Sequence, residues 1–133
     1  MAINSASVTI VTSRFKEVCE FYKNFFLARA SFDCGWYVVL RLSDRIGGPE
    51  ICLMEPRDKM AEFSGGATLN LCVEDADMFY NQLTRNGLSP VIPLEDHPWG
   101  DRGFGIIDPC GLVVYCYHPI EPATEYKVYH LNP

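Results

Sequence analysis

The sequence predicts an α+β fold in which two tandem βαβββ modules form a single domain over residues 1–133. The order of strand-like and helix-like segments occurs twice along the chain. Apolar helix positions in the two halves are also separated by a constant 61 residues, as in Val18 and Phe79 (79 − 18) or Tyr22 and Leu83 (83 − 22). A four-stranded sheet covered by one helix leaves its other face open, so we expect the two mixed sheets to curve around a shared cavity.

The first module is expected over residues 5–56. Alternating apolar residues predict a strand at 7–12, and a stripe of apolar residues from Phe15 to Phe26 predicts a helix for which Ser13 can act as N-cap. Runs rich in β-branched and aromatic residues, separated by turn residues, predict strands at 27–33, 36–42 and 50–54. The charged segment 57–66 is predicted to be a linker.

The second module is expected over residues 67–120. It begins with a predicted strand at 67–73, followed by a helix that Glu74 or Asp75 can cap and that Asn86-Gly87 ends. Further strands are predicted at 89–94, 103–108 and 112–118, the last two joined by the turn Asp108-Pro-Cys-Gly111. Residues 121–133 are predicted to form an irregular tail without chemistry of its own.

The charge and hydropathy patterns exclude several classes of partner. A net charge of −6 without a basic patch argues against binding to nucleic acid. No basic stretch precedes an apolar one at the start, and no run reaches the roughly 18 apolar residues of a membrane span. We therefore expect a cytoplasmic protein that does not act at a membrane.

The cysteines do not have the spacing of a zinc site. Neither a CxxC pair nor a Cys/His motif occurs, and four of the six cysteines lie in apolar periodic segments: Cys19, Cys52, Cys72 and Cys116. We expect most of them to be reduced residues of the core.

Three features together resemble a known family. They are Phe21-Tyr22 in the first helix, Asn86-Gly87 at the end of the second, and the segment Pro98-Trp-Gly-Asp-Arg-Gly-Phe-Gly-Ile-Ile-Asp-Pro-Cys-Gly111. With the βαβββ repeat, they make residues 5–120 similar to the glyoxalase/bleomycin-resistance/dioxygenase (vicinal oxygen chelate) superfamily. The resemblance implies either a metal-dependent enzyme or a metal-free binding protein, since the family contains both.

The positions that hold the metal in the family's enzymes carry poor ligands in this chain. They fall at Ser7, near Cys52, at Thr68 and at Tyr115, where the family has His, Gln or Glu. The resemblance therefore implies no metal, no cofactor and no catalytic residue. A metal-dependent lyase, isomerase or dioxygenase with displaced ligands such as Glu50, Glu55 or His97 is kept as the alternative.

The side of each sheet away from its helix is expected to bind the ligand. Predicted stacking residues are Phe32, Trp36, Trp99 and Tyr115, and predicted polar contacts are Glu50, Asn70 and His97. His97 is expected in a loop, beside Glu95 and Asp96, whose charge would favour a cationic ligand. We thus expect a homodimer that sequesters a small cationic or aromatic compound.

Overall fold

The computed structural model describes residues 1–132 and divides the chain into two units, each treated separately below. The first unit comprises Met1–Gly65 together with Asp108–Gly111. The second comprises Gly66–Ile107 and the chain from Leu112 onward. No helix among the described residues is long and apolar enough to cross a membrane.

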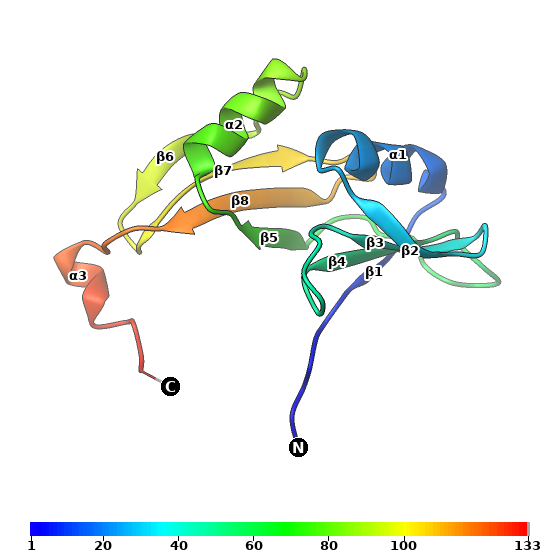
Figure 1. Ribbon diagram of the computed structural model, residues 1–133, viewed down its shortest axis with the longest axis horizontal. Helices are drawn as coiled ribbons and strands as arrows, with labels where there is room; N and C mark the ends of the chain where they lie inside the picture. The colour runs from blue at the N-terminus through cyan, green and yellow to red at the C-terminus, as the bar shows by residue number, and fades with distance from the viewer. Residues whose placement is uncertain (133) are drawn as a thin grey trace. The chain divides into compact units, whose positions relative to one another are not determined.

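Each unit contains one four-stranded mixed sheet and one long helix (Figure 1). The first contains β1 (Thr9–Val11), α1 (Phe15–Phe25), β2 (Arg29–Asp33), β3 (Tyr37–Arg41) and β4 (Glu50–Met54), with strand order β1-β4-β3-β2. The second contains β5 (Thr68–Cys72), α2 (Ala76–Arg85), β6 (Ile92–His97), β7 (Asp101–Ile107) and β8 (Val113–Pro119), with order β5-β8-β7-β6. β1 runs parallel to β4 and β5 to β8, while the other pairs are antiparallel. The α+β fold of two βαβββ modules is therefore confirmed.

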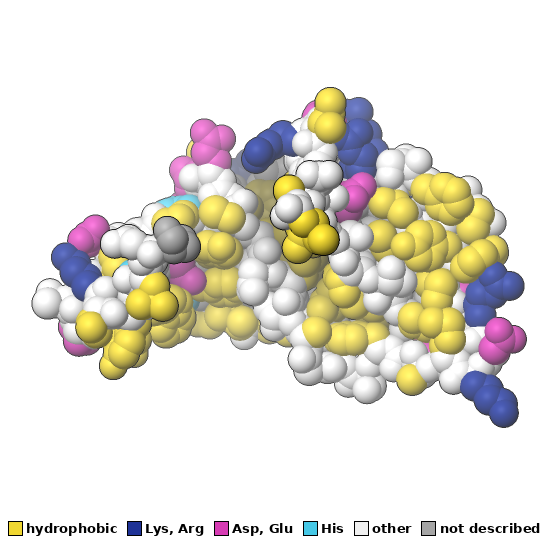
Figure 2. Space-filling view, turned by 90° about the horizontal axis from the view of Figure 1, so that it is seen from below, with side chains coloured by type: hydrophobic (Ala, Val, Ile, Leu, Met, Phe, Trp, Pro, Cys, Tyr) yellow, Lys and Arg dark blue, Asp and Glu magenta, His cyan; other side chains and the backbone are white. Residues whose placement is uncertain are grey.

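Each sheet buries one face under its helix because its strands alternate apolar and polar residues. In the first unit the buried side chains include Val38, Leu40, Ile51 and Leu53 of the sheet and Val18 and Tyr22 of α1. In the second they include Phe104, Ile106, Val114 and Cys116 of the sheet and Leu83 of α2. The other face of each sheet, called the open face below, is the one away from α1 or α2. Figure 2, seen from below Figure 1, shows hydrophobic side chains gathered on the side away from α1 and α2.

Several local predictions are corrected by the structure. Ser13 is not the cap of α1: Arg14 occupies that position, and the Ser13 amide instead donates to Glu62. Asp75 does cap α2, accepting from the amides of Asp77 and Met78. The predicted strand at 89–94 begins and ends later, as β6, and therefore includes His97.

Two predictions about the chain's surface are also corrected. The tail is not wholly irregular, because Thr124–Lys127 form the short helix α3. All six cysteines are free, but Cys72 is exposed rather than in the core, since its side chain lies on the open face of β5.

The most buried polar contact of the first unit joins Tyr22 of α1 to the turn at Asp108. The Tyr22 hydroxyl donates to Asp108 Oδ2 over 2.6 Å, while Asp108 Oδ1 accepts from the Cys110 amide over 2.9 Å. Tyr22 is fully buried and Asp108 is 4% exposed. A buried carboxylate requires such donors, because it has lost its hydration.

We predict that Tyr22→Phe lowers the free energy of unfolding by about 1–3 kcal/mol, because the Asp108 carboxylate loses a donor that water cannot replace. Chemical denaturation would measure the change. Tyr129→Phe is the control, since Tyr129 is 72% exposed. An equal, negligible effect of both variants would contradict the prediction.

Arg102 of β7 holds two carboxylates of the second unit. Its guanidinium donates to both oxygens of Asp77 over 2.8 and 2.9 Å, and to Asp96 over 3.0 Å. The hydrogen bonds from Arg102 lower the pKa of Asp77, which lies in the first turn of α2. The pair therefore fastens α2 to the sheet only while Asp77 is ionised.

The lowered pKa of Asp77 predicts a loss of stability in acid. A carboxyl whose folded-state pKa is depressed stabilises the protein fully above its unfolded-state value of about 4, and this contribution is lost as the pH falls through the folded-state value. Asp77→Asn should therefore be less stable than the wild type at neutral pH and equal to it in strong acid, as measured by urea unfolding. Glu125→Gln is the control on an exposed site, and a difference that persists in strong acid would refute this account.

Candidate functional site

A hollow of about 450 Å³ lies on the open face of the second sheet, and it is called the aromatic pocket below. Its lining residues come from β5, the β6–β7 turn, β7, β8 and the tail: Asn70, Trp99, Gly100, Asp101, Tyr115, Tyr117, Pro119 and His130. Strand register brings Asn70 beside Tyr115, because these two residues pair across β5 and β8. Cys72 pairs with Tyr117 in the same ladder. Residues two apart on a strand share a face, so Tyr115 and Tyr117 both lie on the open side.

The Asp101 carboxylate organises the polar side of the aromatic pocket. Its Oδ1 accepts from the Tyr115 hydroxyl over 2.8 Å and lies 2.7 Å from His97 Nδ1, while its Oδ2 accepts from the Trp99 indole over 3.1 Å. Since a carboxylate only accepts, His97 Nδ1 carries the proton of this contact. The side chains of His97 and Asp101 are only 13% and 14% exposed. Three side chains are thereby fixed around one buried negative charge.

The rings of the pocket are arranged in two stacked pairs. His97 and Trp99 have ring centroids 4.5 Å apart and planes inclined by 5°. Tyr115 and Tyr117 have centroids 5.8 Å apart and planes inclined by 19°. Trp99 remains 48% exposed, so one of its faces is available to a planar ligand.

The electrostatics of the pocket favour neutral or cationic ligands. Burial, together with the hydrogen bond to Asp101, raises the pKa of Tyr115, so this phenol remains a donor. Burial also raises the pKa of Tyr117. No lysine or arginine is among the lining residues. Asp96 is paired with Arg102, which also holds Asp77, and the attraction of a cationic ligand by Glu95 and Asp96 stays a prediction. Among the lining residues, Asp101 carries a carboxylate.

Gly103 provides the space that the Tyr115 ring occupies. A Cβ at this position would lie 2.8 Å from the Tyr115 hydroxyl and 2.7 Å from the Cys116 carbonyl oxygen. In the sequence, Gly103 was recognised only as part of the segment 98–111, without a role of its own. Its position in the strand with alternating glycines, Gly103 and Gly105, was the signal for a close approach.

The predicted site residues fall in different units. Asn70, His97, Trp99 and Tyr115 lie together in the second unit, in or directly against the aromatic pocket. Phe32, Trp36 and Glu50 lie in the first unit. There the rings of Phe32 and Trp36 each lie 6.2 Å from Tyr37, and the Arg57 guanidinium lies 3.9 Å over Trp36. Glu50 pairs in register with Arg41. The involvement of all seven residues in binding stays a prediction.

One of the three histidines differs from its expected placement. His97 lies at the end of β6 rather than in a loop, and it is largely buried. His118 accepts a hydrogen bond from the Ala76 amide at the start of α2, over 2.9 Å. His130 of the tail lines the aromatic pocket, although the tail was expected to take no part in it.

The residues at the family's metal positions do not fit a metal site. Thr68 pairs with Val113 and not with Tyr115, and Cys52 pairs with Thr9 and not with Ser7. Tyr115, with its raised pKa, is committed as a donor to Asp101, which disfavours the phenolate that a metal would require. Among residues 1–132, no group of three or more His, Cys, Asp or Glu side chains is arranged to hold a metal ion.

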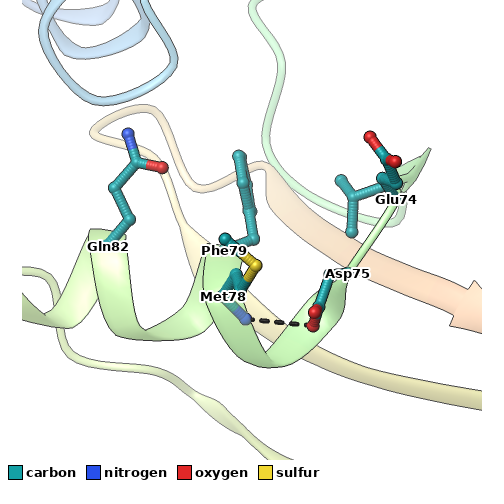
Figure 3. A pocket seen from close by; sticks show the side chains of 6 residues that line it. Glu74, Asp75, Met78, Phe79 and Gln82 are labelled. Atoms are coloured by element: carbon teal, nitrogen blue, oxygen red, sulfur yellow. Dashed lines mark hydrogen bonds between the residues drawn. The ribbon is translucent and has the colours of Figure 1, made fainter.

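A second hollow of about 540 Å³ lies along α2 (Figure 3). Its lining residues are Val73, Glu74, Asp75, Met78, Phe79 and Gln82. The Asp75 carboxylate already accepts hydrogen bonds as the N-cap of α2. This hollow has one phenylalanine, tyrosine or tryptophan ring in its lining, whereas the aromatic pocket has three. We therefore take the aromatic pocket as the candidate functional site.

We predict that Gly103→Ala displaces the Tyr115 ring and destabilises the second unit by about 1–3 kcal/mol through overpacking. The Trp99 indole N–H resonance in a ¹H–¹⁵N spectrum should shift, because its acceptor Asp101 loses the Tyr115 donor; Trp36→Phe would assign the resonance. Gly105→Ala is the matched comparison: its Cβ would meet Ile92, at Cδ1, Cγ1 and Cβ over 2.7 to 3.1 Å, so it should leave the Trp99 resonance unchanged. An unchanged Trp99 resonance in Gly103→Ala would contradict the role assigned to Gly103.

Solved structures share this fold at low sequence identity. TioX from Micromonospora sp. ML1 is 18% identical, with a TM-score of 0.70 over 87% of this chain and 98% of TioX. TnmS3, an antibiotic binding protein from Streptomyces sp. CB03234, is 20% identical, with a TM-score of 0.73 over 90% of this chain and 98% of its own. A lactoylglutathione lyase from Agrobacterium tumefaciens is 16% identical, with a TM-score of 0.70 over 88% of this chain and 92% of the lyase.

These similarities show a shared fold and do not choose between a binding protein and a lyase. No curated protein sequence matches the chain. A sequence model of one family, in contrast, matches residues 4–115, which is most of the chain. The chain belongs to the Glyoxalase/Bleomycin resistance protein/Dioxygenase superfamily.

Proposed function

We propose that this protein binds a small aromatic compound, neutral or cationic, in the aromatic pocket and does so without a metal ion. The observation that carries the proposal is the Asp101 network, in which one carboxylate fixes Trp99, Tyr115 and His97 around the hollow. Rings that are held in place before the ligand arrives lose little conformational entropy on binding. Such a surface suits stacking on a planar ligand.

The charge of the pocket supports the same ligand class. Asp101 brings a negative charge, and no cation among the lining residues offsets it. An anionic ligand would therefore meet repulsion, whereas a cationic ring would be attracted both by Asp101 and by the faces of the aromatic side chains. TnmS3, whose fold is similar, is described as an antibiotic binding protein, which is consistent with a role in sequestering a small molecule.

The alternative is a metal-dependent lyase or dioxygenase that uses displaced ligands. Its best candidate ligand, His97, donates through Nδ1 to Asp101, an orientation that a metal-ligating histidine also uses. What disfavours the alternative is that, among residues 1–132, no group of three or more His, Cys, Asp or Glu side chains is placed to hold a metal ion. Assembly of the chain as a homodimer belongs to the proposal as well, since the edge strands β2 and β6 leave one side of each sheet unpaired.

We predict that 9-aminoacridine, a planar cationic probe, binds the protein saturably and quenches Trp fluorescence. Trp99→Ala should weaken this binding by about 1–3 kcal/mol, because the stacking surface and its buried area are lost. Met78→Ala is the matched control: it removes a side chain that is 69% exposed in the hollow along α2. If Met78→Ala lost affinity and Trp99→Ala did not, the probe would bind in the hollow along α2, and the proposed function of the aromatic pocket would be wrong.

A further inference from the structure

The C-terminal segment forms one wall of the aromatic pocket. Pro119 and His130 both line the hollow, although eleven positions separate them in the chain (130 − 119). The segment between them turns back through α3, and an ion pair of 2.8 Å between Lys127 and Glu121 closes this turn. The fold of the tail therefore returns His130 to the site.

Backbone hydrogen bonds fasten the tail to the turn that carries Trp99. The Ile120 amide donates to the Gly100 carbonyl over 2.9 Å, and the Ala123 amide donates to the Pro98 carbonyl over 2.8 Å. Gly100 has a φ of +118°, and a Cβ there would lie 3.3 Å from both the Ile120 carbonyl oxygen and the Pro122 side chain. Glycine thus permits the close approach of tail and turn.

The hydrogen bond of His130 fixes its tautomer. Its Nε2 lies 2.7 Å from the Trp99 carbonyl oxygen, which can only accept, so Nε2 carries the proton. In the neutral ring, Nδ1 is then an unprotonated acceptor. Among residues 1–132, no protein group hydrogen-bonds to this Nδ1, and the ring is exposed.

Two other polar groups of the pocket, Asp101 and Tyr115, are arranged differently. Asp101 already accepts from three side chains, and the Tyr115 hydroxyl donates its proton to Asp101. His130 Nδ1 is thus an acceptor on a residue that lines the pocket, with no donor from the described part of the chain. A ligand that brings an N–H or O–H to this rim would supply the donor.

We propose that His130 determines ligand specificity by accepting, through Nδ1, a hydrogen bond from an amino or hydroxyl group on the aromatic ligand. The inference rests on the proposed function and deepens it, because it names the substituent that the pocket selects. It also gives the C-terminal segment a part in recognition. Aromatic compounds without such a donor should bind through stacking alone.

The test compares two cationic probes with one ring system, 9-aminoacridine and 10-methylacridinium, by fluorescence titration of the full chain; only the first carries an N–H donor. The wild type should prefer 9-aminoacridine. His130→Ala should weaken 9-aminoacridine by about 2- to 10-fold, the range of one hydrogen bond, and leave 10-methylacridinium unchanged. His130→Asn should restore part of the preference, because its amide can donate to the Trp99 carbonyl and still present an acceptor.

Tyr129→Ala is the matched control, since it removes the neighbouring exposed ring of the tail without touching Trp99. The proposal is overturned if His130→Ala weakens both probes equally, if it changes neither, or if Tyr129→Ala has the same selective effect. Failure of the wild type to bind either probe would instead overturn the proposed function, and this inference with it. Circular dichroism of each variant would confirm that the fold is retained.

Discussion

The arrangement of the aromatic pocket depends on the Asp101 carboxylate. A carboxylate at 14% exposure has lost most of its hydration, and it is stable in the fold only if donors replace the water. Here those donors are a phenol from β8, an indole from the β6–β7 turn and an imidazole from β6. Satisfying one buried charge therefore fixes the orientation of three rings, and these rings form the surface that a ligand would meet.

The second sheet makes this arrangement possible in two ways: strand pairing places His97 opposite Asp101, and a glycine leaves room for the Tyr115 ring. Gly103, beside Tyr117 across the ladder, leaves room for the Tyr115 hydroxyl to reach Asp101. The other face of the same strands buries apolar side chains under α2, among them Phe104, Val114 and Cys116. Alternate residues of β7 and β8 therefore have different roles. Those on the helix side stabilise the fold, and those on the open face line the aromatic pocket. The Arg102 pair with Asp77 helps to hold α2 against this sheet.

The sequence predicted those parts of the structure that follow from local periodicity. Alternation along β5 and β8 sufficed to place Asn70 and Tyr115 on the open face, since a strand has a period of two. It failed at β6, because the polar run Glu95-Asp96-His97 resembles a loop and becomes a strand only through pairing with Asp101–Gly103. The contact between His97 and Asp101 is a product of that pairing.

Long-range backbone contacts explain the other omissions. The tail is held by amides and carbonyls that any sequence could supply, so nothing in residues 121–132 indicated that His130 returns to Trp99. The burial of Asp108 beside Tyr22 likewise joins positions 86 residues apart, which no local pattern records. Negative charge near Trp99 was expected from Glu95 and Asp96, whereas the carboxylate in the pocket lining is that of Asp101, which pairing of β6 with β7 places opposite His97.

The aromatic pocket is proposed to bind its ligand through Asp101 and the rings that Asp101 orders, with no metal taking part. Calorimetric titration of 9-aminoacridine tests this, into protein treated with a chelator and into the same protein supplied with Mn²⁺ or Zn²⁺. We predict equal affinities in the two samples and a loss of affinity in Asp101→Asn. Binding that appears only after the metal is added, and that survives in Asp101→Asn, would contradict this proposal.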